Sequence, residues 1–270
     1  MQQRSIGNLM ALSLLWSVGF LFLAGVAAGK AWKEDPELLN RLENHFGVKI
    51  SGGNYYFTIN DDNDDSFLPK TDQWSLAPSI QTIDVQAVST EFEITTGQTD
   101  KVEVSATGRF NEKKTASLLE VTEKNGEISI REPKLNSVRS VKTSLVVPKN
   151  WHGNVQIKLV SGDLQLSDLS TKNIEIKTVS GDLVLNEVKA EVVNLKTVSG
   201  EIRGKLAEQP EIDITSVSGD VRLKLSSAGD FAFDLKTISG DIENQFGIQN
   251  SGKSVVKIRT TSGDVTIEKQ

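Results

Sequence analysis

A short motif that recurs along the C-terminal half restricts the fold of this chain more than any other feature. Ser-Gly-Asp or Ser-Gly-Glu occurs six times, and successive serines lie 19, 19, 19, 21 and 23 residues apart. Each unit contains two short segments in which apolar and polar residues alternate, as in strands with one buried face. One unit alone cannot bury both strands, so the repeat favours a stack of units around a continuous core. The motif residues are Ser161, Gly162, Asp163, Ser180, Gly181, Asp182, Ser199, Gly200, Glu201, Ser218, Gly219, Asp220, Ser239, Gly240, Asp241, Ser262, Gly263 and Asp264.

We expect this motif to form a structural ladder of turns at one corner of the stack. Glycine permits a tight or left-handed corner, and serine and aspartate can hydrogen-bond to backbone groups there. Stacked carboxylates repel one another, and three sources of relief are open: the cations Lys177, Lys196, Lys236 and Arg259, backbone donors, or a bound cation. A structural role is the preferred interpretation. Calcium between the rungs and a catalytic pair of carboxylates are the alternatives.

Alternating strands also precede the repeats, between Ile80 and Pro148. The predicted fold class is therefore all-β: a single-stranded β-solenoid, or β-helix, with rungs of about 19 residues and a strand-rich N-terminal cap. A β-sandwich of hairpins is the alternative fold. It is less favoured because it would not require the same residue at the same position of every repeat unit. We assign 80–270 to one solenoid domain, with the repeats at 160–270.

The N-terminal segment, residues 1–33, is predicted to be a hydrophobic helix that acts as a membrane anchor or a signal peptide. No charged residue occurs from Ser5 to Gly29. A helix over the apolar run 9–28 would be about 30 Å long, the thickness of a bilayer's hydrocarbon core. This length favours an uncleaved anchor over a cleaved signal peptide. Either would deliver the rest of the chain outside the cytoplasm if the N-terminus stays inside.

Residues 34–79 are expected to form a short helix and an acidic linker. The apolar spacing of Leu38, Leu42 and Phe46 is helical. The acidic run at 60–65 lacks the glycine and glutamate that an EF-hand loop requires, so a solvated loop is favoured over weak calcium binding. From residue 47 to residue 79 no period is sustained, and we predict an irregular segment.

Composition excludes several classes of function. The chain has no cysteine, which excludes disulfides, zinc–thiolate sites and cysteine nucleophiles. Its two histidines, His45 and His152, are expected on the short helix and in a loop, without catalytic roles. With 30 basic and 36 acidic residues, the net charge is −6, and the chain lacks the basic footprint of a nucleic-acid binder. No cofactor is expected.

The Ser-Gly-Asp units, together with the lead-in sequences at 145–148 and 153–155, resemble the bacterial putative-adhesin family, a family of unknown function. The resemblance covers about Ile80 to Gln270 and implies a right- or left-handed single-stranded β-helix, an extracytoplasmic location and no known enzymatic activity. It supplies no functional residues. Two departures, Glu201 in place of aspartate and Gly204 in place of an inward leucine, predict a local irregularity in the third rung.

The resulting functional hypothesis is a non-enzymatic protein of the cell envelope, inner-membrane anchored or periplasmic, that presents its solenoid surface for adhesin-like binding or scaffolding. Its expected partners are the membrane, through an uncleaved N-terminal helix, and an envelope protein or glycan. An enzyme acting on envelope polysaccharide, an envelope-stress regulatory partner, and an ice- or mineral-binding face are the alternatives. The last would use the column Thr178, Thr197, Ser216, Thr237 and Thr260.

Overall fold

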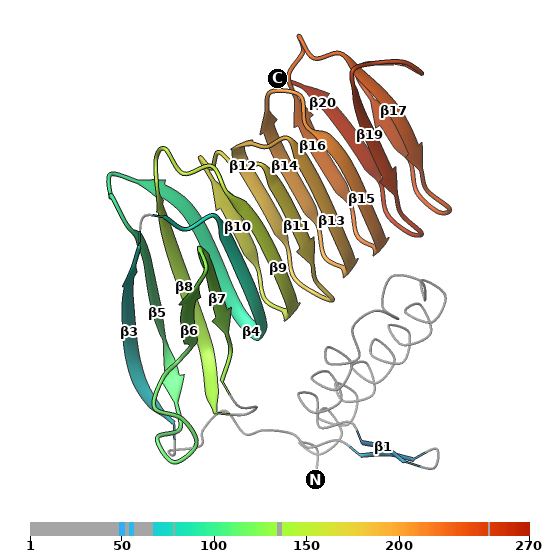
Figure 1. Cartoon of the computed structure of the whole chain (residues 1–270). Helices are drawn as coiled ribbons and strands as arrows, with labels where there is room; N and C mark the ends of the chain where they lie inside the picture. The colour runs from blue at the N-terminus through green and yellow to red at the C-terminus, as the bar shows by residue number, and fades with distance from the viewer. Residues whose placement is uncertain (1–48, 52–53, 57–66, 78, 134–136, 248) are drawn as a thin grey trace. The chain divides into compact units, whose positions relative to one another are not determined.

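The computed structural model describes residues 49–51, 54–56, 67–77, 79–133, 137–247 and 249–270 (Figure 1). All regular elements of these residues are strands, twenty in number, and they include no helix long and apolar enough to cross a membrane. Strands β1 (Lys49–Ser51) and β2 (Asn54–Tyr56) form an antiparallel pair. The expected membrane segment at 1–33, the short helix with His45 and the acidic run at 60–65 lie outside the described residues.

The remaining strands form a largely parallel stack with two faces, which share the long strand β4 (Thr82–Gly97). The first sheet contains, besides the C-terminal half of β4, the strands β3 (Leu68–Leu76), β5 (Val102–Phe110), β8 (Val138–Pro148), β10 (Leu164–Ser167), β12 (Leu183–Lys189), β14 (Ile202–Ala207), β16 (Val221–Leu225), β18 (Ile242–Asn244) and β20 (Val265–Lys269). The second sheet contains, besides the N-terminal half of β4, the strands β6 (Glu120–Lys124), β7 (Glu127–Arg131), β9 (Asn154–Ser161), β11 (Asn173–Lys177), β13 (Val192–Ser199), β15 (Glu211–Ser218), β17 (Phe231–Lys236) and β19 (Ser254–Arg259).

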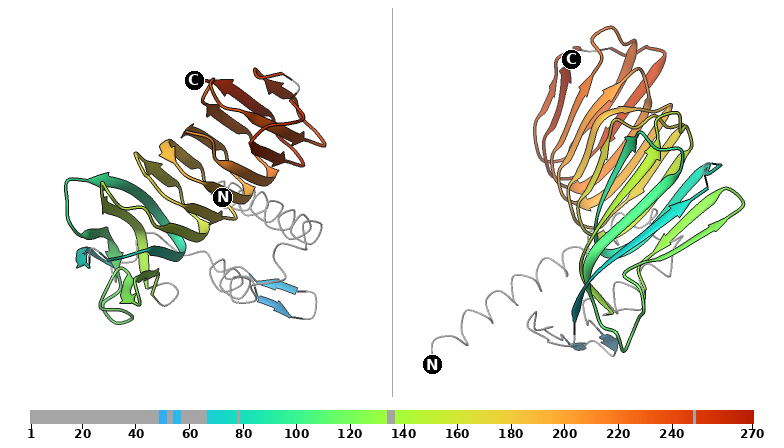
Figure 2. Two further views of the ribbon diagram at one scale, coloured as in Figure 1. Left: turned by 45° about the horizontal axis from the view of Figure 1, so that its top comes forward. Right: turned by 90° about the vertical axis from the view of Figure 1, so that its left-hand side faces the viewer.

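Strands of the repeat pair in parallel with equivalent residues opposite each other. In the first sheet, Leu164 pairs with Leu183, Leu183 with Ile202, and Ile202 with Val221. All four side chains are buried, and the same inward alternation continues along the second sheet. The apolar columns thus meet in one continuous core between the two sheets, because every strand places alternate residues inward. Figure 2 shows the strands of neighbouring rungs side by side.

The order of the rungs in space differs from their order in the chain at the C-terminal end. Strands β15 and β16 pair with β19 and β20, and these pair in turn with β17 and β18. The last rung of the chain therefore lies between the two rungs that precede it. This corrects the expectation that successive units stack in sequence, and it makes β17 and β18, rather than β20, the edge strands of the stack.

The N-terminal end is interleaved in a similar way. β4 pairs on one side with β7 and β8 and on the other side with β9 and β10, although β9 follows β8 directly in the chain. Beyond β8, the strands β5 and β3 add in antiparallel fashion, and β6 adds to β7 in the same way. Strand β4 thus lies in the segment that was expected to form a cap, but it is itself a rung of the parallel stack.

One segment expected to be an irregular linker is a strand. Residues 68–76 of the segment 47–79 form β3, which pairs with β5 over its whole length. Its side chains are only half-buried or exposed, so its apolar alternation is weak. Pro69 does not prevent this pairing, because β3 is paired on one side only within the described residues, and proline is tolerated on an edge strand.

Candidate functional site

The Ser-Gly-Asp motif lies at the corner that connects the second sheet to the first. Its serines form bridges between neighbouring rungs, and the glycines adopt positive φ values, for example +132° at Gly162 and +123° at Gly181. A Cβ on Gly181 would overlap with the carbonyl oxygen of Gly162 in the rung below. Backbone approaches so closely here that only glycine fits, which explains why the motif keeps this residue in every unit.

Four of the six carboxylates of the motif, those of Asp163, Asp182, Asp220 and Asp264, accept hydrogen bonds from the main chain of an adjacent rung. Asp163 Oδ1 accepts from the N–H of Asp182 at 2.9 Å, and Asp182 Oδ1 accepts from the N–H of Glu201 at 2.9 Å. Asp264 forms the equivalent bond to the N–H of Asp241 at 2.9 Å. Backbone donors, one of the three expected sources of relief, therefore stabilise the stacked negative charges. The bond also satisfies N–H groups that the corner would otherwise leave without a strand partner.

The expected cations contact other acids. Lys177 Nζ lies 2.8 Å from Glu175 Oε1, and both Lys236 and Arg259 contact Asp234 on the second sheet. The hydrogen bond from Lys177 lowers the pKa of Glu175, and that from Lys236 lowers the pKa of Asp234. These contacts lie on the strand that precedes each corner. Lys177 and Glu175 are two residues apart on one strand, as are Lys236 and Asp234, and such side chains share one face of the sheet.

Glu201 has different partners from the aspartates of the column. Its carboxylate contacts the guanidinium of Arg203 in its own rung, and its Oε1 lies 3.2 Å from Arg222 Nη1 in the next rung. The same guanidinium lies 3.6 Å from Asp220. The hydrogen bond to Glu201 raises the pKa of Arg203. The longer side chain of glutamate thus bridges two arginines on the outer face of the first sheet.

Gly204 faces inward between Leu185 and Leu223 and leaves the register unchanged. A Cβ at this position would lie 2.6 Å from Leu223 Cδ2, so the leucine occupies the volume that a side chain would need. The irregularity expected in this rung lies one rung earlier, as a register shift between Asn186 and Val188. Glu187, within this shift, has a φ of +53°.

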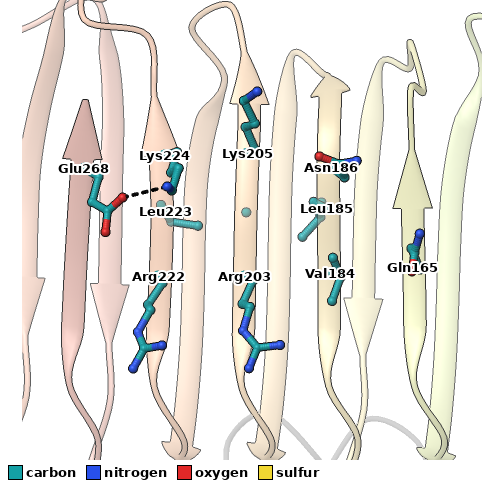
Figure 3. Close-up of a pocket in the computed structure, with 11 residues that line it drawn as sticks. Gln165, Val184, Leu185, Asn186, Arg203, Lys205, Arg222, Leu223, Lys224 and Glu268 are labelled. Atoms are coloured by element: carbon teal, nitrogen blue, oxygen red, sulfur yellow. Dashed lines mark ion pairs between the residues drawn. The ribbon is translucent and has the colours of Figure 1, made fainter. Parts of the chain in front are cut away.

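An open groove of about 450 Å³ crosses this part of the first sheet (Figure 3). Residues of five strands, β10, β12, β14, β16 and β20, line it. Its most conspicuous feature is a set of four cations in two opposed pairs: Arg203 lies opposite Arg222, and Lys205 lies opposite Lys224. Glu268 is the acidic residue of the lining, with its Oε2 3.0 Å from Lys224 Nζ.

All four cations of the groove have acidic partners, yet they are substantially exposed. Side chains of Arg203, Arg222 and Lys224 are 52%, 55% and 56% exposed. Lys205 contacts Glu187 at the register shift. The acidic partner of the two arginines is less exposed: Glu201, which contacts both of them, is 20% exposed, so a bound anion would use the exposed N–H groups of the cations and would not replace this acid.

The threonine column faces the interior and not the solvent. Thr178, Thr197, Ser216 and Thr260 are buried, and Thr178 Oγ1 donates to the carbonyl of Ser180 at 3.1 Å. Equivalent bonds join Thr197 to Ser199 and Thr260 to Ser262. Thr237 is half-buried, and its hydroxyl donates to the Gly263 carbonyl at 3.2 Å. The column therefore supports the corners, and the ice- or mineral-binding face is wrong because four of its five residues are buried.

His152 lies in the loop before β9, as expected, 3.6 Å from Glu191 and 3.4 Å from the Ser170 hydroxyl. Trp151 beside it is buried, and its Nε1 donates to the Ile80 carbonyl at 2.8 Å. No group of three or more His, Cys, Asp or Glu side chains is placed to hold a metal ion in the part of the chain that the structure describes.

Fold and site together define an all-β, solenoid-like protein with turn ladders at its corner and an exposed groove on one sheet. The chain belongs to the Toastrack DUF4097 family, whose profile matches residues 80–203 and 152–268. This match agrees with the resemblance to an adhesin-like family of unknown function. That the Ser-Gly-Asp motif is characteristic of this family stays a prediction. No curated protein matches the chain.

Solved structures with a similar course of the chain share little sequence with it. A "putative cell adhesion protein" from Clostridium sporogenes is 13% identical, with a TM-score of 0.49 over 75% of this chain and 100% of that one. A "putative adhesin" from Bacteroides fragilis is 14% identical, with a TM-score of 0.45 over 74% and 97%. A "putative lipid binding protein" from Parabacteroides distasonis is 17% identical, with a TM-score of 0.34 over 75% and 96%.

The residues of the groove were missed by the sequence analysis, although the sequence contains a signal for them. The third and fourth units read Arg-Gly-Lys at 203–205 and Arg-Leu-Lys at 222–224, where the first two units have no cation. Alternation places both cations of each triplet on the face opposite the buried residues. A comparison of the outward positions between units, and not only of the inward ones, would have found the two pairs.

Proposed function

We propose that this protein is a non-enzymatic, adhesin-like component of the cell envelope that binds or scaffolds through the outer face of its solenoid. The observation that carries the proposal is the open groove with its two opposed pairs of cations. It is an open surface over five strands that combines exposed cations with apolar atoms, and it suits a partner that lies across the strands. The repeat carboxylates have a structural use in the corner ladder.

Enzymatic cleavage of an envelope polysaccharide is the less favoured alternative. Such an enzyme needs two carboxyl groups about 5–9 Å apart, and the general acid of the pair needs a raised pKa. The shifts at Glu175 and Asp234 have the opposite direction, because lysines stabilise the ionised forms. Asp163 and Asp182 use a carboxylate oxygen as an acceptor for the main chain, as a structural role requires.

The location and the domain division belong to the same proposal. Residues 1–33 would anchor the chain in the membrane or direct its export, and 80–270 would form the binding domain with its repeats at 160–270 and rungs of about 19 residues. The segment 34–79 would connect the two, apart from β3, which belongs to the first sheet of the binding domain. The support is the uncharged apolar run at 9–28, which is long enough to span a bilayer. An extracytoplasmic compartment also suits a chain without cysteine, whose fold does not depend on the redox state.

Two measurements test this proposal. Protease accessibility of the full chain in intact cells and spheroplasts, with N-terminal sequencing, determines its side of the membrane and whether the leader is cleaved. Sedimentation of the purified full chain with cell-envelope fragments freed of membrane lipid measures binding through the solenoid and not insertion of residues 1–33. We expect protection in intact cells, digestion in spheroplasts, and co-sedimentation. Digestion only after lysis of the spheroplasts, or no co-sedimentation, would overturn the proposal.

A further inference from the structure

The distribution of charge around the groove differs from that in the rest of the first sheet. Arg203 lies directly opposite Arg222, and Lys205 opposite Lys224, on neighbouring parallel strands. Like charges in opposed positions destabilise a sheet. The preceding rungs avoid this arrangement at the same positions, where Gln165 lies opposite Val184 and Ser167 opposite Asn186. Acidic partners offset this repulsion, and Glu201 contacts both arginines. The two cationic rungs still gather four exposed donors at one place on the first sheet, where an anionic ligand can use them.

The cations are also arranged to act together. Neighbouring strands are about 4.8 Å apart and alternate residues along a strand about 6.6 Å, so the Cα atoms of the four cations occupy the corners of a small rectangle. Figure 3 shows Arg203 and Arg222 side by side and Lys205 and Lys224 further along the same strands. Each guanidinium offers several N–H donors in a planar fork, which matches the two oxygens of a carboxylate or sulfate group.

The form of the groove indicates a chain-like ligand. It is open and runs across the strands from β10 to β20, so its long direction follows the axis of the stack. Backbone at Gly204 and apolar atoms of Val184, Leu185 and Leu223 contribute to its floor and walls. Both pairs span the same two rungs, those of β14 and β16. An extended polymer along the axis of the stack can therefore place successive acidic groups against successive rungs, whereas a compact anion would use only one pair of cations.

We propose that this groove, defined by Arg203, Lys205, Arg222 and Lys224, is a binding site for an extended acidic polysaccharide whose carboxylate or sulfate groups accept hydrogen bonds from the exposed N–H groups of these cations. This inference rests on the proposed function and names its ligand class. Because the protein as a whole carries a net charge of −6, it repels polyanions at long range, and binding requires the local site.

Binding of the purified full chain to polygalacturonate and to dextran sulfate, with neutral dextran as the negative control, tests the proposal. The site variant is the double substitution Arg203→Gln/Arg222→Gln, and the matched control is Lys177→Gln/Lys196→Gln. The control removes the same charge from opposed, outward positions of the second sheet. Circular dichroism and thermal unfolding of both variants monitor folding, and Arg203→Lys/Arg222→Lys keeps the charge without the planar fork.

We expect the site variant to bind an acidic polysaccharide about tenfold more weakly or worse, since two charge-assisted contacts are lost, with intermediate affinity for the lysine variant. The control variant should stay within about twofold of the unsubstituted chain. Equal weakening of both double variants would overturn the proposal in favour of general charge attraction. Absence of binding to both acidic polymers would also overturn it. Binding only to phosphatidylglycerol vesicles, through the same arginines, would assign the site to lipid headgroups instead.

The same variants separate this inference from the proposed function. If the full chain and Arg203→Gln/Arg222→Gln co-sediment equally with envelope fragments, the protein is an envelope binder and the groove is not its polysaccharide site. If neither co-sediments, the proposed function itself fails. Loss of co-sedimentation in the site variant alone, with the control unaffected, supports both.

Discussion

Ser218 pairs with Ser262 across the corner of the stack, although Ser239 is the next serine of the repeat along the chain. Ser239 pairs with Ser262 from the other side. The final rung is therefore enclosed by two rungs that are consecutive in sequence. At the other end, β4 is enclosed in the same manner by β7–β8 and β9–β10. Both β4, the first strand of the segment 80–270, and the final rung are thus enclosed by other rungs of that segment, while β3 is an edge strand beyond β5.

The order of these rungs can be tested with disulfides, because the chain has no cysteine of its own. Neighbouring strands are about 4.8 Å apart, within the range of about 4.4–6.8 Å between the Cα atoms of a disulfide. We expect rapid cross-linking of Ser218→Cys/Ser262→Cys on mild oxidation, measured by non-reducing electrophoresis and mass spectrometry. Ser218→Cys/Ser239→Cys is the control and should not cross-link. Preferential cross-linking of the control pair would show that the rungs stack in sequence.

The enclosed final rung should contribute strongly to stability. Ile258 on β19 is fully buried, whereas Val255 on the same strand is 44% exposed. Ile258→Ala is expected to reduce the free energy of unfolding by about 2–5 kcal/mol, because it removes packed atoms and leaves a cavity. Val255→Ala should change it by about 0.5 kcal/mol or less. Denaturant unfolding measures both, and equal effects would contradict the assignment of β19 to the interior of the stack.

The corner glycines should not tolerate a side chain. Gly181→Ala would place a methyl group against the Gly162 carbonyl in a backbone conformation with a φ of +123°. We expect a loss of about 3 kcal/mol or more, from overlap together with backbone strain. Gly247→Ala isolates the strain, since φ is +75° there and no atom lies within 4 Å of the added Cβ. It should cost about 1–2 kcal/mol in thermal or denaturant unfolding.

The carboxylate ladder predicts a difference between two substitutions of the same residue. Asp182→Asn retains an oxygen that can accept from the N–H of Glu201, whereas Asp182→Ala removes it. Alanine should therefore reduce stability by about 0.5–1.5 kcal/mol more than asparagine. If the ladder instead depended on the negative charge of a cation site, asparagine and alanine would be equally destabilising. Thermal unfolding with and without added calcium compares the two cases.

The pair of Glu175 and Lys177 predicts a pH dependence of known sign. The hydrogen bond from Lys177 lowers the pKa of Glu175 from its ordinary value of 4.5, and Lys158 and Lys196 add to this. A lowered pKa in the folded state contributes stability above pH 4.5, and this is lost as the pH falls through the folded value. Lys177→Gln should raise the pKa of Glu175 in an NMR titration. Lys257→Gln, which removes the partner of Asp213, should leave it unchanged.

Part of the fold follows directly from local features of the sequence. The inward alternation of Leu164 with Leu166 and of Ile174 with Ile176 predicted two strands in each unit, and these residues are buried in the core. β3 escaped prediction because its residues are half-buried or exposed, and a strand without a buried face has no clear period. The groove was not predicted because the residues at outward positions of different units were not compared with one another.

The sequence by itself determined the content of each rung: two strands, their inward residues, and a corner at which glycine is required. It did not determine the order of the rungs, because units of the same phase present similar edges and each can pair with several others. Only the tertiary structure placed Ser262 between Ser218 and Ser239, through pairings between distant segments. The same long-range pairing brought Glu268 of the final rung next to Lys224 and so completed the groove, whereas Arg203 lies opposite Arg222 because consecutive units stack in phase.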